Sequence, residues 1–151
     1  MIQRIQTVYL LMAIILTSLM IGFPVMEIVS YEKIFYTVTV LGVYADKSME
    51  YSVWTLLMLC ISTILIALAT IFQFKKRMFQ MRLCVFNILL TVGFYVVLGG
   101  YYWILGERFS TNEILLKWTV ILPALNIILF YLSIRAIGKD EALVKALDRL
   151  R

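Results

Sequence analysis

The chain alternates long apolar stretches with short segments that carry its charged residues. No charged residue occurs in residues 5–26, 51–74, 83–106 and 118–134. A helix needs roughly 20 apolar residues to cross about 30 Å of hydrocarbon. Three of these stretches meet that length, and flanking apolar residues extend the fourth to about 116–136. The pattern predicts an all-α integral membrane protein, a single domain over residues 1–151 that is built as a bundle of four transmembrane helices.

The connection between the first two spans, residues 24–50, has the pattern of β-strands. Residues 34–43 are rich in β-branched and aromatic side chains, and residues 25–30 form a second, shorter run of this kind. Residues 31–33 between them fit a tight hairpin loop, and Gly42 indicates a bulge or bend. Because an isolated hairpin is marginally stable in water, we expect it to pack on the helix ends or to gain a strand from the next outer connection. It then caps the bundle, or its open edge docks a partner.

The tail after the last span, residues 137–151, has a helical pattern of its own. Gly138 is placed to end the span as a C-terminal cap, and Asp140 to cap the start of a new helix. Apolar residues then recur with helical spacing, at Leu143, Ala146, Leu147 and Leu150. We predict a short amphipathic helix that lies on the membrane surface or fits the groove of a partner.

The basic residues are distributed unevenly between the two sides of the membrane that these spans define. One side has ten of them and three acidic residues, the ten being Arg4, Lys75, Lys76, Arg77, Arg82, Arg135, Lys139, Lys145, Arg149 and Arg151. The other side has six acidic residues and four basic ones, which are Lys33, Lys47, Arg108 and Lys117. Because basic residues near span ends stay in the cytoplasm, we predict cytoplasmic termini and an extracytoplasmic hairpin.

The tryptophans give an independent check of this topology. Trp54, Trp103 and Trp118 all fall at the outer ends of predicted spans. Tryptophan favours the membrane interface because its ring is apolar and its N–H is polar. We interpret these residues as lipid anchors, with an aromatic cage for a substrate as the alternative.

The amino-acid composition indicates a membrane protein and excludes several kinds of catalytic and metal site. Hydrophobic residues make up 63% and charged residues 15%, with a mean hydropathy of +0.95, against about 45–50% and 25% in soluble domains. The chain has no histidine and two cysteines, which excludes His-based triads, His proton relays and the common zinc sites. We therefore predict no catalytic residue, no cofactor and no metal site. The pI of about 9.3 does not indicate nucleic-acid binding, because the positive charges flank the spans and meet lipid headgroups there.

The spans hold few strongly polar residues. Asn87 falls near one end of the third span, and Asn126 near the middle of the fourth. An asparagine in hydrocarbon needs a partner, which is usually a group on a neighbouring helix. We interpret both as interhelical polar contacts, with a pore or ligand role as the alternative for Asn126. Cys60 and Cys84 lie about 20 Å apart in depth, too far for a disulfide.

Two segments on the predicted cytoplasmic side are candidates for contacts with a partner or with lipid. The basic run after the second span acts first as a stop-transfer signal, and its position also suits anionic headgroups. The tail offers an apolar stripe flanked by charge. The candidate residues are Lys75, Lys76, Arg77, Arg82, Leu143, Leu147, Asp148, Arg149 and Leu150.

Three parts of the chain carry a resemblance to one family. They are residues 1–10, then 76–77 with 81–84 and Asn87, and at the end 134–137, 139–141, 143–144 and 147–151. With these motifs the whole chain resembles an uncharacterised bacterial membrane family, the domain of unknown function 4293 found in Bacteroidota. The resemblance implies a four-helix protein of the bacterial inner (cytoplasmic) membrane. It implies no reaction, because the family has no activity to carry over.

These observations predict a non-enzymatic accessory or scaffold subunit of an inner-membrane complex, whose partners are the lipid bilayer and one or more membrane proteins. The sequence leaves the oligomeric state open. The alternative is a small transporter, or a protein that binds lipid or a small molecule in the core around Asn126. A continuous wet cavity at Asn126 favours this alternative, and a dry core favours the accessory role. A membrane enzyme is disfavoured because the outer carboxylates are scattered, at Glu27, Asp46, Glu50, Glu107 and Glu113.

Overall fold

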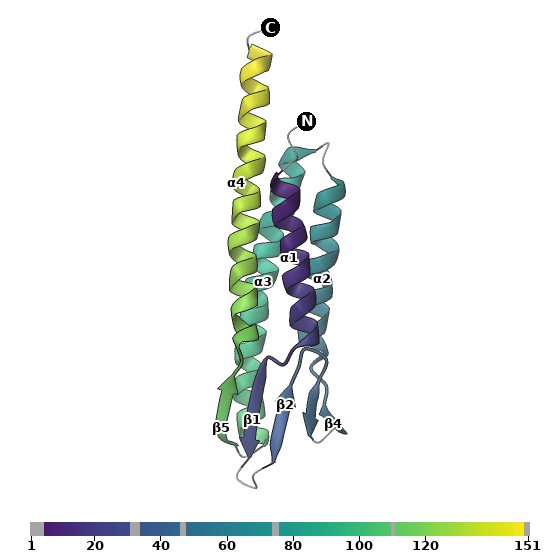
Figure 1. Ribbon diagram of the computed structural model, residues 1–151, viewed down its shortest axis with the longest axis vertical. Helices are drawn as coiled ribbons and strands as arrows, with labels where there is room; N and C mark the ends of the chain where they lie inside the picture. Colours follow the sequence, from purple (N-terminus) through teal and green to yellow (C-terminus); the bar gives the residue numbers. More distant parts are fainter. Residues whose placement is uncertain (1–4, 31–33, 46–47, 74–75, 110, 150–151) are drawn as a thin grey trace.

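A computed structural model describes residues 5–30, 34–45, 48–73, 76–109 and 111–149. Within these segments, four α-helices stand side by side, and a five-stranded sheet lies at one end of them (Figure 1). The elements in chain order are α1 (Ile5–Gly22), β1 (Met26–Ser30), β2 (Phe35–Val38), β3 (Val43–Ala45), β4 (Ser48–Tyr51), α2 (Trp54–Phe72), α3 (Arg77–Arg108), β5 (Thr111–Leu116), η1 (Trp118–Val120) and α4 (Ile121–Arg149). We call the end with the sheet the sheet end, and the opposite end the far end.

The helices have the length and composition of membrane spans. The helices α1, α2 and α3, and the segment Trp118–Val144 of η1 and α4, are long and apolar enough to cross a membrane. The prediction of four long apolar helices is thus confirmed for the described part of the chain. Their ends differ from the predicted spans, since Tyr51 and Leu116 fall within those spans but lie in strands. Pro123 lies in the first turn of α4, where its missing N–H is not needed, so the helix continues past it.

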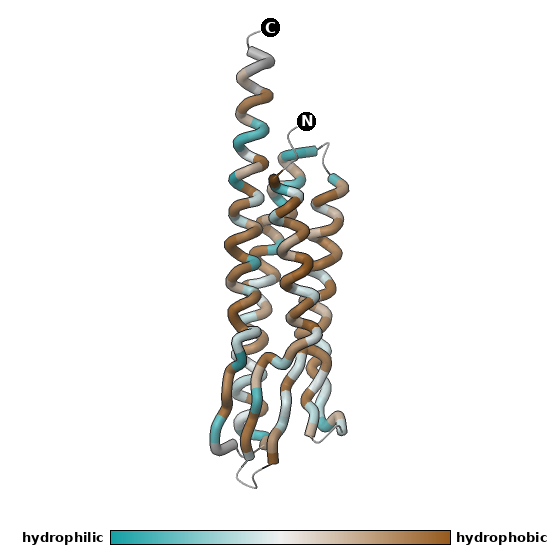
Figure 2. Tube along the Cα trace, viewed as in Figure 1, coloured by the Kyte–Doolittle hydropathy of each residue, from teal (hydrophilic) through white to brown (hydrophobic). Residues whose placement is uncertain are grey.

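Buried residues in the helices recur at alternating spacings of four and three, the seven-residue repeat of left-handed helix bundles. In α1 they are Gln6, Leu10, Ala13, Thr17 and Met20. In α2 they are Leu56, Cys60, Thr63, Ala67 and Thr70. Many of these inward residues are small or polar, whereas exposed positions carry large apolar side chains such as Ile15, Leu65 and Val96. Hydrophobic residues dominate the middle of the bundle, and hydrophilic ones gather toward its two ends (Figure 2), as a surface that faces lipid requires.

The sheet has the strand order β4-β3-β2-β1-β5 in the described residues, and its neighbouring strands are antiparallel. The predicted hairpin is present as β1 and β2, with Met26 opposite Val38; its loop, residues 31–33, lies outside the described residues. Gly42 lies in the tight connection to β3, where a Cβ would come within 3.1 Å of the Tyr51 backbone oxygen. The hairpin also gains β5 from the connection after α3. The fold thus contains a larger sheet than the small hairpin that we predicted.

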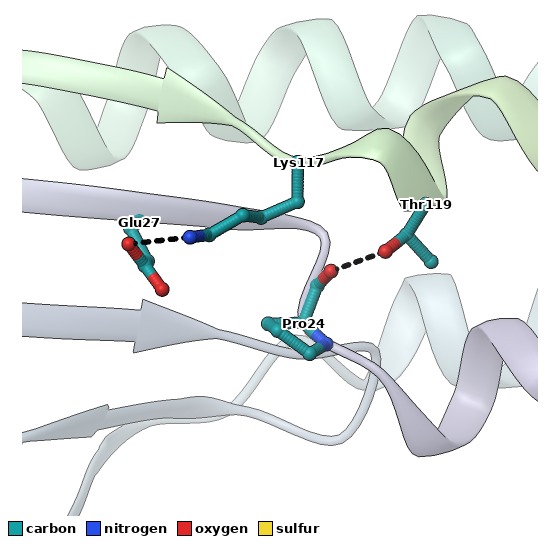
Figure 3. A network of polar contacts seen from close by, with 4 residues as sticks. All are labelled: Pro24, Glu27, Lys117 and Thr119. Carbon is teal, nitrogen blue, oxygen red and sulfur yellow. Dashed lines mark hydrogen bonds and ion pairs between the residues drawn. The ribbon is translucent and has the colours of Figure 1, made fainter.

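Strands β1 and β5, which pair with each other, are each connected to a helix of the bundle. β1 follows α1, and β5 precedes α4. Figure 3 shows the polar contacts between them: the Lys117 ammonium lies 2.8 Å from a Glu27 carboxylate oxygen, and the Thr119 hydroxyl donates to the Pro24 carbonyl at 2.6 Å. The Lys117 amide also donates to the Val25 carbonyl at 3.0 Å. These bonds hold the ends of α1 and α4 together.

The end of α3 packs against the same sheet. The Phe109 ring lies 4.3 Å from the Tyr36 ring, centroid to centroid, and the Ser30 hydroxyl donates to the Phe109 carbonyl at 2.9 Å. The guanidinium carbon of Arg108 lies 4.9 Å from the Tyr51 ring centroid, which is a cation–π distance. Leu105 is fully buried there. The sheet therefore covers the part of α3 that extends beyond the other helices at this end.

Candidate functional site

The far end of the bundle differs from the prediction for the tail. Helix α4 runs without interruption through Gly138 to Arg149, and it projects beyond the ends of the other helices (Figure 1). The prediction that Gly138 ends the span and Asp140 starts a new helix is therefore wrong. A glycine inside a helix costs only about 1 kcal/mol relative to alanine. The Arg77 guanidinium donates to the Asp140 carbonyl at 2.8 Å, which braces α4 just beyond that glycine.

The depth of this projecting end follows from helix geometry. The 21 residues from Trp118 to Gly138 cover about 30 Å, the thickness of the hydrocarbon. Measured from Trp118, residues after Gly138 extend beyond that thickness. There Leu143 is 64% exposed and Val144 is 41% exposed. The side chains of Leu147, Asp148 and Arg149, and all of Leu150, lie outside the described residues.

The start of α3 lies beside this part of α4, and an open groove of about 600 Å³ separates the two. Its lining residues are Lys76, Arg77, Met78, Phe79, Arg82, Glu141 and Val144. The structure thus brings three of the predicted basic contact residues together, while Lys75 lies outside the described residues. A second groove of about 360 Å³ lies at the same end. It is lined by Ile5, Tyr9, Leu132, Arg135, Ala136, Lys139 and Asp140. The two grooves, which we call the α3–α4 groove and the α1–α4 groove, are rich in cations.

A polar layer crosses the middle of the bundle. The Asn126 amide nitrogen donates to the Thr17 hydroxyl at 2.9 Å, which joins α4 to α1. Thr17, Thr63, Thr91 and Asn126, one from each helix, line a common cavity of about 10 Å³. Such a volume holds about one water molecule. At the level of Asn126, the described residues therefore surround a cavity the size of one water molecule, and not a channel.

The threonine hydroxyls of this layer already donate their hydrogen bonds. Each threonine hydroxyl donates to a carbonyl one turn earlier in its own helix: Thr17 to Ala13, Thr63 to Leu59 and Thr91 to Asn87, at 2.8–2.9 Å. The threonine oxygens can therefore only accept further bonds. The Asn126 amide oxygen has no hydrogen-bond partner among the described residues. The polar part of the lining therefore offers acceptors from the threonines and Asn126, while Met20, Leu59, Cys60, Phe94 and Pro123 make the rest of the lining.

A second group of buried amides lies nearer the far end. Asn87 is fully buried, and within the described structure its amide nitrogen and oxygen have no partner. The side-chain oxygens of Gln6 and Gln80 are also buried and have no hydrogen-bond partner among the described residues. The Cys84 thiol lies 3.9 Å from the Ser133 hydroxyl. The interior of the far half therefore mixes these buried polar groups with an apolar cluster that includes Leu10, Phe130 and Ile137.

Comparison with known protein families identifies the family of this chain. Residues 2–150 match the family described as Domain of unknown function (DUF4293). The chain belongs to this family. No curated protein matches it. Because the family description names no activity, the role of this DUF4293 protein has to be argued from its geometry.

Much of the inner polarity of the DUF4293 protein was missed by sequence reasoning. Gln6, Gln80 and Ser133 are buried at helix interfaces, but the prediction named only the asparagines. The signal was present, because polar residues repeat at seven-residue intervals, as from Gln80 to Asn87 and from Asn126 to Ser133. Alignment of the spans on this repeat would have found them.

Other reactive groups of the DUF4293 protein make structural contacts. Glu27 pairs with Lys117, and Glu107 accepts a bond from the Trp103 indole at 2.9 Å. Cys60 and Cys84 are buried and free, as predicted. Asp46 lies outside the described residues. In the described ranges, no three His, Cys, Asp or Glu side chains come together as metal ligands.

Proposed function

We propose that the chain is a non-enzymatic accessory or scaffold subunit of an inner-membrane complex, and that it docks its partner with the projecting end of α4. The observation that carries this proposal is the exposure of Leu143 and Val144 on the part of α4 that projects beyond the other helices (Figure 1). Apolar side chains in that position are stabilised when another surface buries them. An amphipathic helix in a partner groove is a common form of such contact.

A protein partner fits this helix better than the lipid surface does. An amphipathic helix binds lipid when it lies in the plane of the interface. Here the helix continues α4 directly, along the bundle axis (Figure 1). Lipid could cover Leu143 only if α4 bent near Gly138, which would remove the contact from Arg77 to the Asp140 carbonyl.

The bundle core favours the same role over transport. The cavity at Asn126 has a volume of about 10 Å³, and a transported solute needs a larger, continuous path. The inward residues on either side of it, such as Leu10, Leu56 and Phe130, are fully buried and apolar. The scattered carboxylates likewise favour a role without catalysis, since acid–base chemistry needs groups that converge on one substrate.

Photo-crosslinking tests the docking role. A photoreactive amino acid at Leu143 should give a discrete protein adduct in membranes of the native host. The matched control is Leu65, which is 60% exposed, against 64% for Leu143, but lies in the middle of α2 and faces lipid. The absence of a protein adduct at residue 143 would overturn the proposal. An adduct with the mass of two copies of this chain would also overturn it. A lipid adduct at both positions would instead assign the tail to the membrane surface.

The orientation that we propose places the far end in the cytoplasm, on the basis of the excess of Lys and Arg there. Met49 in β4 and Met78 in α3 are 54% and 53% exposed at opposite ends. With Cys60 and Cys84 replaced by alanine, Met49→Cys should react with an impermeant thiol reagent in cells with a permeable outer envelope. Met78→Cys should react only after the membrane is broken. The reverse pattern would place the docking helix outside the cytoplasm.

A further inference from the structure

The α3–α4 groove has a charge that the docking of α4 does not use. Lys76, Arg77 and Arg82 line it, together with one acidic residue, Glu141. Arg77 gives one N–H to the Asp140 carbonyl, and a guanidinium has five N–H groups in all. The groove therefore has an excess of positive charge and donors that can still bind an anion.

The depth of the groove can be read from contacts between α3 and α4. Cys84 lies against Ser133, and Arg77 against Asp140, so the helices run antiparallel in register over one seven-residue repeat. In this register Phe79 is level with Gly138, which marks the edge of a roughly 30 Å hydrocarbon layer that begins at Trp118. Arg82 lies about 5 Å inside that edge, and Arg77 lies just outside it. The groove thus spans the level at which lipid phosphates lie.

We infer that the α3–α4 groove binds the headgroup of an anionic phospholipid, with its phosphate among Lys76, Arg77 and Arg82. Arg82 can extend its charged end outward from the hydrocarbon edge while its methylenes stay apolar. Met78 and Phe79, which are about half exposed, provide an apolar wall for the glycerol backbone and the first methylenes. Basic pockets between spanning helices are a known form of lipid headgroup site. This inference does not depend on the docking role of α4.

The α1–α4 groove provides a control within the same molecule. Arg135 lies level with Arg82 in the register above, and it is also exposed. Its groove is smaller, and Asp140 accompanies the cations there. A variant at either position loses one positive charge, and the two charges lie at the same depth. A difference between the two variants therefore reports on the groove and not on general attraction between a basic protein and an acidic lipid.

The test uses the purified full chain in an uncharged detergent and measures lipid binding by native mass spectrometry. Phosphatidylglycerol should bind more tightly than phosphatidylcholine with the same acyl chains. Arg82→Gln should weaken phosphatidylglycerol binding about fivefold, and Lys76→Gln with Arg82→Gln about 25-fold, at roughly fivefold per cation. Arg135→Gln should change it less than twofold. Equal melting temperatures in phosphatidylcholine show that the variants remain folded.

Each of the contrary results overturns the inference. If Arg135→Gln weakens binding as much as Arg82→Gln, the attraction is diffuse and the groove is not a site. If inorganic phosphate binds the chain and phosphatidylglycerol does not, at the same ionic strength, the groove binds free phosphate and not a headgroup. If phosphatidylcholine binds as tightly as phosphatidylglycerol, the cations do not select the ligand.

Discussion

The two ends of the bundle are completed in different ways. At the sheet end, strands from two connections cover the helices, and the exposed rings of Trp54, Trp103 and Trp118 surround this level. At the far end, open grooves flank α4, and its last turns stand beyond their neighbours (Figure 1). The sheet end is finished by backbone hydrogen bonds within the chain, whereas the far end leaves apolar and cationic groups for another molecule. Changes at the sheet end should therefore affect stability, and changes at the far end should affect binding.

The largest contrast is expected between two substitutions by aspartate. Ile28 is fully buried in β1 between β2 and β5, so Ile28→Asp should destabilise the protein by about 4 kcal/mol. Leu143→Asp should change stability by less than about 0.5 kcal/mol, because its side chain is exposed. Denaturation in detergent measures both. An equal loss in the two variants would mean that the projecting end belongs to the folded core.

A smaller effect on stability is expected from substitution of Asn126, which lies in the middle of the bundle. Asn126→Leu removes the bond to Thr17 and should cost at most about 2 kcal/mol. Asn126→Asp should cost more, because an ionised carboxylate in the cavity has no cationic partner. Thermal unfolding in detergent gives the stability, and the crosslink at residue 143 gives the docking function. A stable Asn126→Leu protein that has lost this adduct would assign Asn126 a functional role.

The ion pair at the sheet end should matter less. Lys117 and Glu27 are each about one-third exposed, so their pairing should contribute less than about 1 kcal/mol and weaken with salt. A double-mutant cycle with Glu27→Gln and Lys117→Met isolates this term. A coupling well above that value would show that the pair, and not the strand pairing, holds α1 to α4.

The smallest effect on stability is expected from truncation. Removal of residues 141–151 takes away none of the apolar length before Gly138, and the Asp140 backbone oxygen that Arg77 contacts remains as part of the new terminal carboxylate. Stability should change by less than about 0.5 kcal/mol, and all spans should still insert, as protease protection can show. Failure of insertion would contradict a tail that serves docking alone.

The spans could be predicted from the sequence because charge is excluded from hydrocarbon, and the hairpin because β-branched residues gather on either side of residues 31–33. Other elements depend on contacts that no local pattern contains. Leu116 was assigned to a helix, since a short apolar run does not distinguish strand from helix, and pairing with Met26 of β1 decides the outcome. Gly138 was assigned as a helix end, but tertiary contacts outweigh its weak local preference.

The candidate sites were predictable to different degrees. Lys76, Arg77 and Arg82 were named from charge alone, but the groove that they share depends on how far α4 projects beside α3. Of the polar layer only Asn126 was named, because a single threonine in a span is too weakly polar to indicate a contact by itself. Their meeting around one cavity follows from the register of the helices, which the seven-residue repeat encodes only when the spans are compared.

The pairing of β1 with β5 has a consequence for biogenesis. Ser30 lies opposite Thr111, so α2 and α3 must be synthesised before β5 can reach its partner. Closing so long a loop carries an entropic cost and makes the contact a slow one to form. Chains that stop before β5 emerges should therefore present an unpaired β1 edge, which invites association with other strands. Addition of β5 is accordingly the step that ends the vulnerable period of synthesis, and it occurs just as α4 enters the membrane.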